Sequence, residues 1–374
     1  MRAALFFKNI TFLLITGLWL AITTGFAAAN AVNANCAVPV FGVAGVMVDE
    51  RAETASLARD NGAAEAAKQA FETVINRIVA DADKRHAFLG QSTPDAFLDF
   101  VHIVAENSLE QRYIATLDFC FDAVRLRAAL NKADLQWAEL ESPPVLVLPI
   151  WRGPDGVHAW HKHNAWIAGW WQAVDDHAGL LRLRRLTRNL ANERRFRGED
   201  IAAGLATTLS AAAAEAGVSK VVVAEAALDF NGWVPEVTVT AALFDKDGAL
   251  IRRFDRQGPY QLAAVQPVEL ADSRDEIIRA LSRDWYAANR IDGSARGAIT
   301  AAVPVASLAE WARRLAAFEA IAVIDGYDIV TLNAAGGQIR LRLVGTREAL
   351  ENALAVHNLK LTGDAGDLSL VPAN

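Results

Sequence analysis

Cysteine and basic residues are scarce in this sequence, and both shortages limit what the protein can be. Two cysteines among 374 residues exclude a disulfide-rich scaffold and a metal domain built on several thiolates. A formal net charge of −7 and a pI of about 5.6 disfavour nucleic-acid binding through phosphate contacts. The sequence also lacks a glycine-rich phosphate motif, a dinucleotide fingerprint and a serine in a glycine-flanked turn. We expect no nucleic-acid partner and no cofactor.

Long apolar runs are missing after the first residues. One run, over residues 10–22, follows the basic residues Arg2 and Lys8 and precedes small residues up to Ala34. This order predicts a cleaved secretion signal over residues 1–34, whereas a membrane span needs about 20 apolar residues. Removal of the two basic residues changes the net charge from −7 to −9. We expect a periplasmic mature chain without a transmembrane span.

The two cysteines, Cys36 and Cys120, predict one disulfide, because exported chains meet oxidising conditions. Cys36 precedes the first predicted strand and Cys120 lies near the end of the third. If these strands are antiparallel neighbours, the start of one lies beside the end of the other. The alternative is a buried free thiol at Cys120 with Cys36 unpaired. Asn35 does not suit a lipid-anchor signal, which needs a small residue directly before the cysteine.

The first part of the mature chain, residues 35–142, has the element order strand, helix, strand, strand, helix, strand. This order is typical of a ferredoxin-like α+β domain. A polar break at Asn107 and Ser108 predicts the hairpin turn. The predicted elements are strand 38–48, helix 54–82, strands 97–106 and 112–121, helix 121–131 and strand 135–140.

Pro143 and Pro144 mark the start of a middle α/β domain, residues 143–262. The continuous apolar run 145–150 predicts a buried parallel strand. A helical connector over residues 263–297 should follow, with its helix at 272–288. The other predicted elements are helix 200–216 ended by Gly217, strands 220–228 and 236–245, and a turn at Asp247 and Gly248 before strand 249–255.

The last part, residues 298–374, repeats the first pattern. Ser307 and Glu310 predict a capping box at one helix, and Thr346 predicts the start of a second. The fold class is therefore two ferredoxin-like α+β domains that flank a middle α/β domain. The predicted elements are strand 298–306, helix 307–317, strands 321–332 and 338–344, helix 346–357 and closing strands within 359–370.

Residues scattered along the mature chain carry a resemblance to a known family. They are Asn76, Arg77, Ile78, residues 113–122, Leu130, Trp137, residues 144–149, Ala159, Trp160, Asn164, Ala165, Trp166, Trp170, Trp311, Leu315, Val344, Gly345 and Leu350. On these residues the mature chain resembles a bacterial envelope family catalogued as domain of unknown function 2066. The resemblance implies an envelope location and this architecture, and it implies no activity. The middle domain is also similar in pattern to the α/β N-terminal domain of the periplasmic TolB protein.

Three closely spaced histidines, His158, His161 and His163, are the candidate metal ligands, with Asp155 and Asp176 nearby. Steps of three and two residues fit no single helical face, so a loop would have to bring them together. A metal-dependent hydrolase that uses the region from His158 to His177 is the alternative function. A solvated loop is the competing interpretation.

Tryptophan is concentrated in the same region, where five of the ten lie between Trp151 and Trp171. An exposed aromatic platform could bind a partner, and its candidate residues are Trp160, Trp166, Trp170 and Trp171. Alternatively, Trp166 and Trp170 lie four residues apart on one helical face and pack in the core.

Seven arginines between Arg182 and Arg197 form the only basic stretch, which could meet anionic headgroups or an acidic partner, or be a solvated face. Since no residue set predicts chemistry, we interpret the protein as a non-enzymatic periplasmic binding or scaffolding protein of the cell envelope, with a protein partner.

Overall fold

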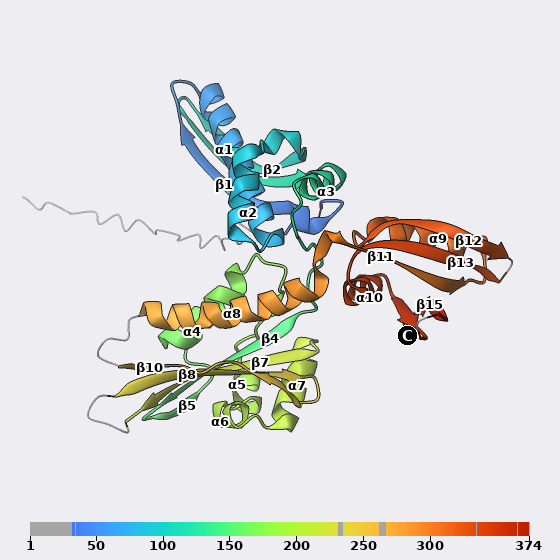
Figure 1. Cartoon of the computed structure of the whole chain (residues 1–374). Helices are drawn as coiled ribbons and strands as arrows, with labels where there is room; N and C mark the ends of the chain where they lie inside the picture. Colours follow the sequence, from blue (N-terminus) through green and yellow to red (C-terminus); the bar gives the residue numbers. More distant parts are fainter. Residues whose placement is uncertain are drawn as a thin grey trace, which may run out of the picture.

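The computed structural model describes residues 32–33, 35–230, 235–261, 267–333, 335–364 and 366–373. These residues form three lobes, each built on its own β-sheet (Figure 1). The predicted secretion signal, residues 1–34, lies outside the described residues apart from residues 32 and 33. The architecture is a mixed α+β fold, which is the general fold class that the sequence pattern predicts.

The first lobe is a three-stranded antiparallel sheet in the order β1-β3-β2, with α1 packed on one face. Thr54 starts α1, because its hydroxyl accepts a hydrogen bond from the Leu57 amide at 3.2 Å. The elements are β1 (Gly42–Arg51), α1 (Ala55–Ile78), α2 (Ala82–Gln91), β2 (Leu98–Leu109), β3 (Arg112–Phe121) and α3 (Ala123–Lys132).

Three sequence predictions for this lobe are wrong in detail. The helix predicted over 54–82 ends early, at Ile78, and a second helix, α2, follows it and is capped by Asp81 through the Lys84 amide. The turn is not at Asn107 and Ser108, which continue β2, but at residues 110–111. Within the described residues, the predicted strand 135–140 is reduced to a single bridge between Trp137 and Ile291.

The middle lobe is a mixed sheet covered on both faces. Its strands run β10-β8-β7-β4-β5, with β6 also on β4 and β9 on β8. The predicted parallel strand is confirmed, since β4 pairs in parallel with β7 and β6. The strands are β4 (Val145–Gly153), β5 (Gly156–His158), β6 (Leu183–Arg184), β7 (Lys220–Asp229), β8 (Glu236–Asp245), β9 (Leu250–Arg253) and β10 (Gln257–Gln261).

Alternate residues of β4 and β7 face opposite layers of helix. Val145 and Val147 pack with α4 and α8, whereas Leu146 and Leu148 pack with α6 and α7. The helix predicted over 200–216 is divided into α6 and α7, and α7 ends at Gly217 in the left-handed conformation, φ 63°. The helices are α4 (Ala165–Asp176), α5 (Leu190–Arg195), α6 (Gly198–Ala202), α7 (Ala206–Ala216) and α8 (Pro267–Asn289).

The third lobe is a five-stranded sheet in the order β12-β13-β11-β15-β14. A ferredoxin-like sheet would place one closing strand antiparallel beside the first. Here the chain end forms a hairpin, and β15 pairs in parallel with β11. The elements are β11 (Ile291–Pro304), α9 (Leu308–Ala320), β12 (Ile324–Asn333), β13 (Gly336–Gly345), α10 (Arg347–Val356), β14 (Leu359–Thr362) and β15 (Leu368–Pro372).

The long helix α8 joins the lobes (Figure 1). The Trp285 indole donates to the Leu140 carbonyl at 2.6 Å, and the Tyr286 hydroxyl donates to the Gln136 carbonyl at 2.6 Å. Burial raises the pKa of Tyr286 to about 12, so this hydroxyl stays protonated. Apolar residues of the first and third lobes form one continuous core cluster. None of the described helices is both long enough and apolar enough to span a membrane.

Candidate functional site

The three histidines do not form a metal site. The rings of His158 and His161 stack at 4.7 Å, and His158 Nε2 lies 3.0 Å from the Asp155 carboxylate. His163 is exposed. No group of three or more histidine, cysteine or acidic side chains in the described ranges could hold a metal ion. The described residues from His158 to His177 therefore provide no metal site for the hydrolase of the alternative hypothesis.

The tryptophans of α4 belong to the core of the middle lobe. Trp166 is 1% exposed and Trp170 is 0% exposed, and their rings meet edge to face at 5.8 Å. The Trp166 indole donates to the Ala224 carbonyl of β7. The prediction of a partner surface is thus wrong for these two residues. Trp160 and Trp171 are half-buried, and Trp160 donates to the Phe196 carbonyl.

Four of the seven arginines in the stretch from Arg182 to Arg197 form ion pairs with acidic neighbours. Ion pairs link Arg185 to Asp175 and Arg195 to Glu215, at 2.8 and 3.1 Å. Arg188 pairs with Glu193 at 2.9 Å. Such pairs satisfy the charges locally, which favours the solvated-face interpretation over a phosphate-binding patch.

Arg77, one of the residues of the family resemblance, links the first and middle lobes from a buried position. Its guanidinium donates to the carbonyls of Val40, Gly42 and Ala178 at 2.7, 2.8 and 2.7 Å. Burial lowers the pKa of Arg77 to about 10, and the carboxylate of Glu141 opposes that shift. The side chain stays charged at neutral pH and fixes the loop after α4 against η1 (Pro39–Phe41).

His177 lies beside this junction, at the end of α4. Burial lowers its pKa below the ordinary value, and within the described residues its Nε2 has no hydrogen-bond partner. The folded state therefore favours the neutral imidazole. The adjoining hollow is lined by the charged residues Asp176, Arg274, Asp275 and Arg279.

We expect His177 to make the protein less stable in mild acid. Below about pH 6.5 the unfolded chain binds a proton on this imidazole, and the folded chain resists the same protonation. Stability should thus fall as pH decreases through the range between the unfolded and folded pKa values. Urea unfolding of wild type and His177→Gln between pH 7.5 and 5 tests this. The decline should be shallower in the variant, and equal slopes would contradict the assignment.

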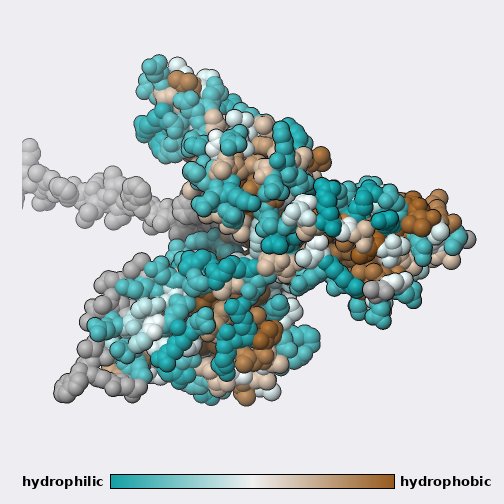
Figure 2. All heavy atoms as spheres, in the orientation of Figure 1, coloured by the Kyte–Doolittle hydropathy of each residue, from teal (hydrophilic) through white to brown (hydrophobic). Residues whose placement is uncertain are grey.

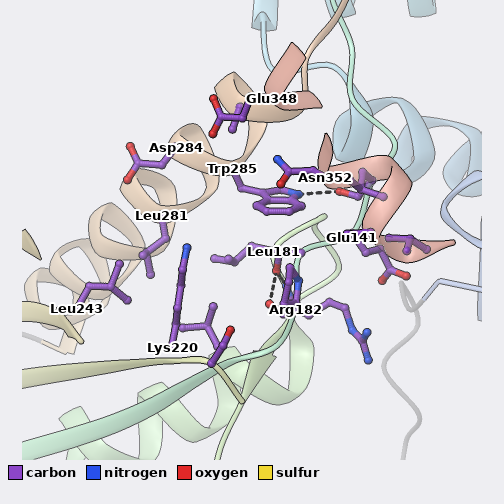
Figure 3. Close-up of a pocket in the computed structure, with 18 residues that line it drawn as sticks. Glu141, Leu181, Arg182, Lys220, Leu243, Leu281, Asp284, Trp285, Glu348 and Asn352 are labelled. Carbon is purple, nitrogen blue, oxygen red and sulfur yellow. Dashed lines mark hydrogen bonds between the residues drawn. The ribbon is translucent and has the colours of Figure 1, made fainter. Parts of the chain in front are cut away.

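A hollow that we call the three-domain cleft has a volume of about 630 Å³ (Figure 3). Its walls come from the linker 140–143, the middle sheet, α8 and α10. The residues that line it include Leu140, Glu141, Leu181, Arg182, Lys220, Leu243, Leu281, Trp285, Glu348, Asn352, Ala355 and Val356. Apolar side chains dominate this lining. A cavity of this size and character is typical of a small-molecule site.

A second feature of functional interest is β2, the edge strand of the first sheet. Along its described length it pairs with β3 alone, and eleven of its twelve residues are exposed. Native edge strands are often short or carry lysine or proline, and β2 has none of these, although Asp99 and Glu106 add charge and two register shifts interrupt its pairing with β3. The exposed apolar side chains of β2 are Phe100, Val101, Ile103, Val104 and Leu109.

The edge strand β12 of the third sheet is similar but less apolar. It exposes Ile329, Val330 and Leu332, and apolar residues gather at this end of the third lobe in Figure 2. β2 is the longer of the two strands and offers more exposed apolar side chains. It is therefore the stronger candidate for a protein contact. Neither strand carries a sequence motif, and only the pairing in three dimensions identifies them as edges.

No family model and no curated protein matches the chain. Among solved structures, lipoprotein GNA1162 from Neisseria meningitidis is 14% identical, over 37% of this chain and 96% of its own, with a TM-score of 0.24. A formyltetrahydrofolate deformylase from Burkholderia mallei is 11% identical, over 56% and 91%, with a TM-score of 0.17. At these TM-scores neither likeness establishes a shared fold.

Proposed function

We propose that this protein is an exported, non-enzymatic protein of the bacterial periplasm that binds another envelope protein. Its binding surface is the edge strand β2, to which the partner adds a strand. The observation that carries the proposal is the long, exposed edge of β2 with its five exposed apolar side chains. The resemblance to domain of unknown function 2066 and the predicted secretion signal support the location.

Strand addition suits this surface for physical reasons. An edge strand presents a row of unpaired amide and carbonyl groups, so an incoming strand gains main-chain hydrogen bonds. The alternating side chains then set specificity. Phe100 lies opposite Cys120 and Val101 lies opposite Phe119, so their side chains point to opposite faces of the sheet. A partner strand would meet apolar contacts on both faces.

Charge argues for a different protein as partner rather than a second copy. Asp99 and Glu106 flank the apolar middle of β2. Antiparallel pairing of two β2 strands about that middle would place Asp99 opposite Glu106, and like charges directly opposite destabilise a sheet. A heterologous strand with apolar residues between basic ones avoids this conflict. The partner segment is thus expected to be extended and basic.

Site-specific cross-linking in intact cells tests the proposal. A photoreactive amino acid at Phe100 should give adducts with an envelope protein. The same group at Val124, which is 75% exposed on α3, should give none and is the matched control. Adding Val104→Lys should reduce the Phe100 adduct about tenfold, since the new charge repels a basic strand, whereas Val124→Lys should not. Equal adducts from both positions, or adducts of two copies of this chain, would contradict the proposal.

A further inference from the structure

We infer that the three-domain cleft is a binding site for a single-chain anionic amphiphile, with Lys220 as the group that recognises the anionic head. This inference goes beyond the edge-strand proposal and depends on different residues. It rests on the shape and lining of the cleft and on one cation placed within it.

The apolar part of the site comes from three elements. Leu281 and Trp285 lie on α8, Leu243 lies on β8, and Leu181 lies in the segment before β6. In Figure 3 the side chains of Leu281, Leu181 and Trp285 surround one space. Trp285 is held in place by its hydrogen bond to the Leu140 carbonyl. An alkyl chain in this space would remove apolar surface from water, which favours binding.

Lys220 supplies the charge. It is the first residue of β7, and in Figure 3 its ammonium group extends between Leu281 and Leu181 towards Trp285. Within the described part of the chain this ammonium has no ion pair or hydrogen bond. Lys220 is an exposed residue, so its ammonium group is hydrated in the free protein and can pair with an anionic group without a large desolvation cost. In a fatty acid, the carboxylate would pair with the Lys220 ammonium and the alkyl chain would contact the apolar lining.

The remaining charged groups of the lining do not compete for Lys220. Asp284 pairs with Arg252 on β9, and Asn352 donates to Asn289. Glu141 and Glu348 lie at the periphery of the space in Figure 3. Arg182, also without an ion pair among the described residues, adds a second positive charge to the lining. The lining as a whole carries three acidic and two basic side chains, so an anionic head group is favoured only beside Lys220, away from Glu141 and Glu348.

Dodecanoate is the test ligand, used below its micellar concentration with the purified mature protein and measured by calorimetry. Wild type should bind dodecanoate at least tenfold more tightly than dodecanol, and dodecyltrimethylammonium should not bind. Lys220→Gln should weaken dodecanoate binding about tenfold and change dodecanol binding less than twofold. Lys246→Gln is the matched control, because Lys246 is an exposed lysine of the same lobe that pairs with Asp247.

A second variant tests the third lobe's contribution. Val356→Glu, at a residue that is 62% exposed and lines the cleft, should also weaken dodecanoate binding without affecting folding. Circular dichroism checks the fold of each variant. Failure of wild type to bind dodecanoate, equal binding by wild type and Lys220→Gln, or equal binding of all three amphiphiles would overturn the inference. None of these outcomes bears on the edge strand β2, whose test is a cross-link in cells.

Discussion

Reduction of the bond between Cys36 and Cys120 should lower the free energy of unfolding by roughly 4–5 kcal/mol, the chain-entropy value for a loop of this length. The structure links the two cysteines, whose Cα atoms are 5.4 Å apart and whose sequence separation is 84 residues. Without the bridge the unfolded chain gains conformational freedom over this whole loop. Urea unfolding of oxidised and reduced wild type measures the difference.

The packing around the bridge adds a second consequence. A side-chain carbon at Gly42 would lie 2.2 Å from Cys36 Sγ, so the disulfide fills space that only glycine leaves open. Cys36 is 6% exposed and Cys120 is 1% exposed. A Cys36→Ser, Cys120→Ser double variant should therefore be at least as unstable as the reduced protein. Two labelled thiols in denatured, unreduced wild type, or identical unfolding of both redox forms, would contradict the prediction.

The cysteine pairing could be predicted from the sequence because it depends on neighbouring strands alone. β1 and β3 are antiparallel neighbours, and Gly42 lies opposite Cys120. The antiparallel pairing of β1 with β3 is present although the sheet has no fourth strand among its described residues. Alternation of side chains in the middle sheet was equally predictable, since Val145 and Leu146 must point to opposite faces.

The fourth strand was not predictable, because long-range contacts decide the conformation of residues 135–140. The apolar pattern of this segment correctly indicates burial, since Trp137 is 1% exposed. Its backbone, however, pairs with Ile291 of the third lobe, and the Ala138 amide donates to the Ile78 carbonyl at the end of α1. A short apolar run shows that residues are buried but does not show which element buries them.

The candidate sites were missed for a related reason. The walls of the three-domain cleft come from separate segments, with Lys220 more than sixty residues from Trp285 along the chain, so no motif spacing marks them. The histidines and tryptophans near residue 160, by contrast, are close together in the sequence. The tryptophans have a structural role, because Trp166 and Trp170 fill the space between α4 and the sheet.

Trp311→Ala should lower the free energy of unfolding of the third lobe by about 3–5 kcal/mol, the usual cost of removing a buried tryptophan side chain. Trp311 lies in the first turn of α9 and is 4% exposed. Its ring covers β13, where a side-chain carbon at Gly337 would approach the ring at 2.7 Å. Alanine would leave a cavity between helix and sheet, because neighbouring backbone cannot close over it.

The start of α9 fixes the orientation of this ring. The Ser307 hydroxyl accepts from the Glu310 amide at 3.2 Å, as predicted. The predicted capping box is incomplete, because the Glu310 carboxylate accepts from the Ala306 amide at 2.9 Å and pairs with Arg314. The helix start is thus held independently of Trp311, so the variant should lose packing rather than the helix itself.

Hydrogen exchange of the amides of α9 and β13 measures this loss locally, which matters because a chain with several lobes need not unfold in one step. Leu308→Ala is the matched control on the same helix. Leu308 is 77% exposed, and its truncation should change stability by less than about 0.5 kcal/mol. A loss below about 1 kcal/mol for Trp311→Ala would mean that the ring does not support the sheet, and that Phe318, which is 0% exposed, holds α9 against it.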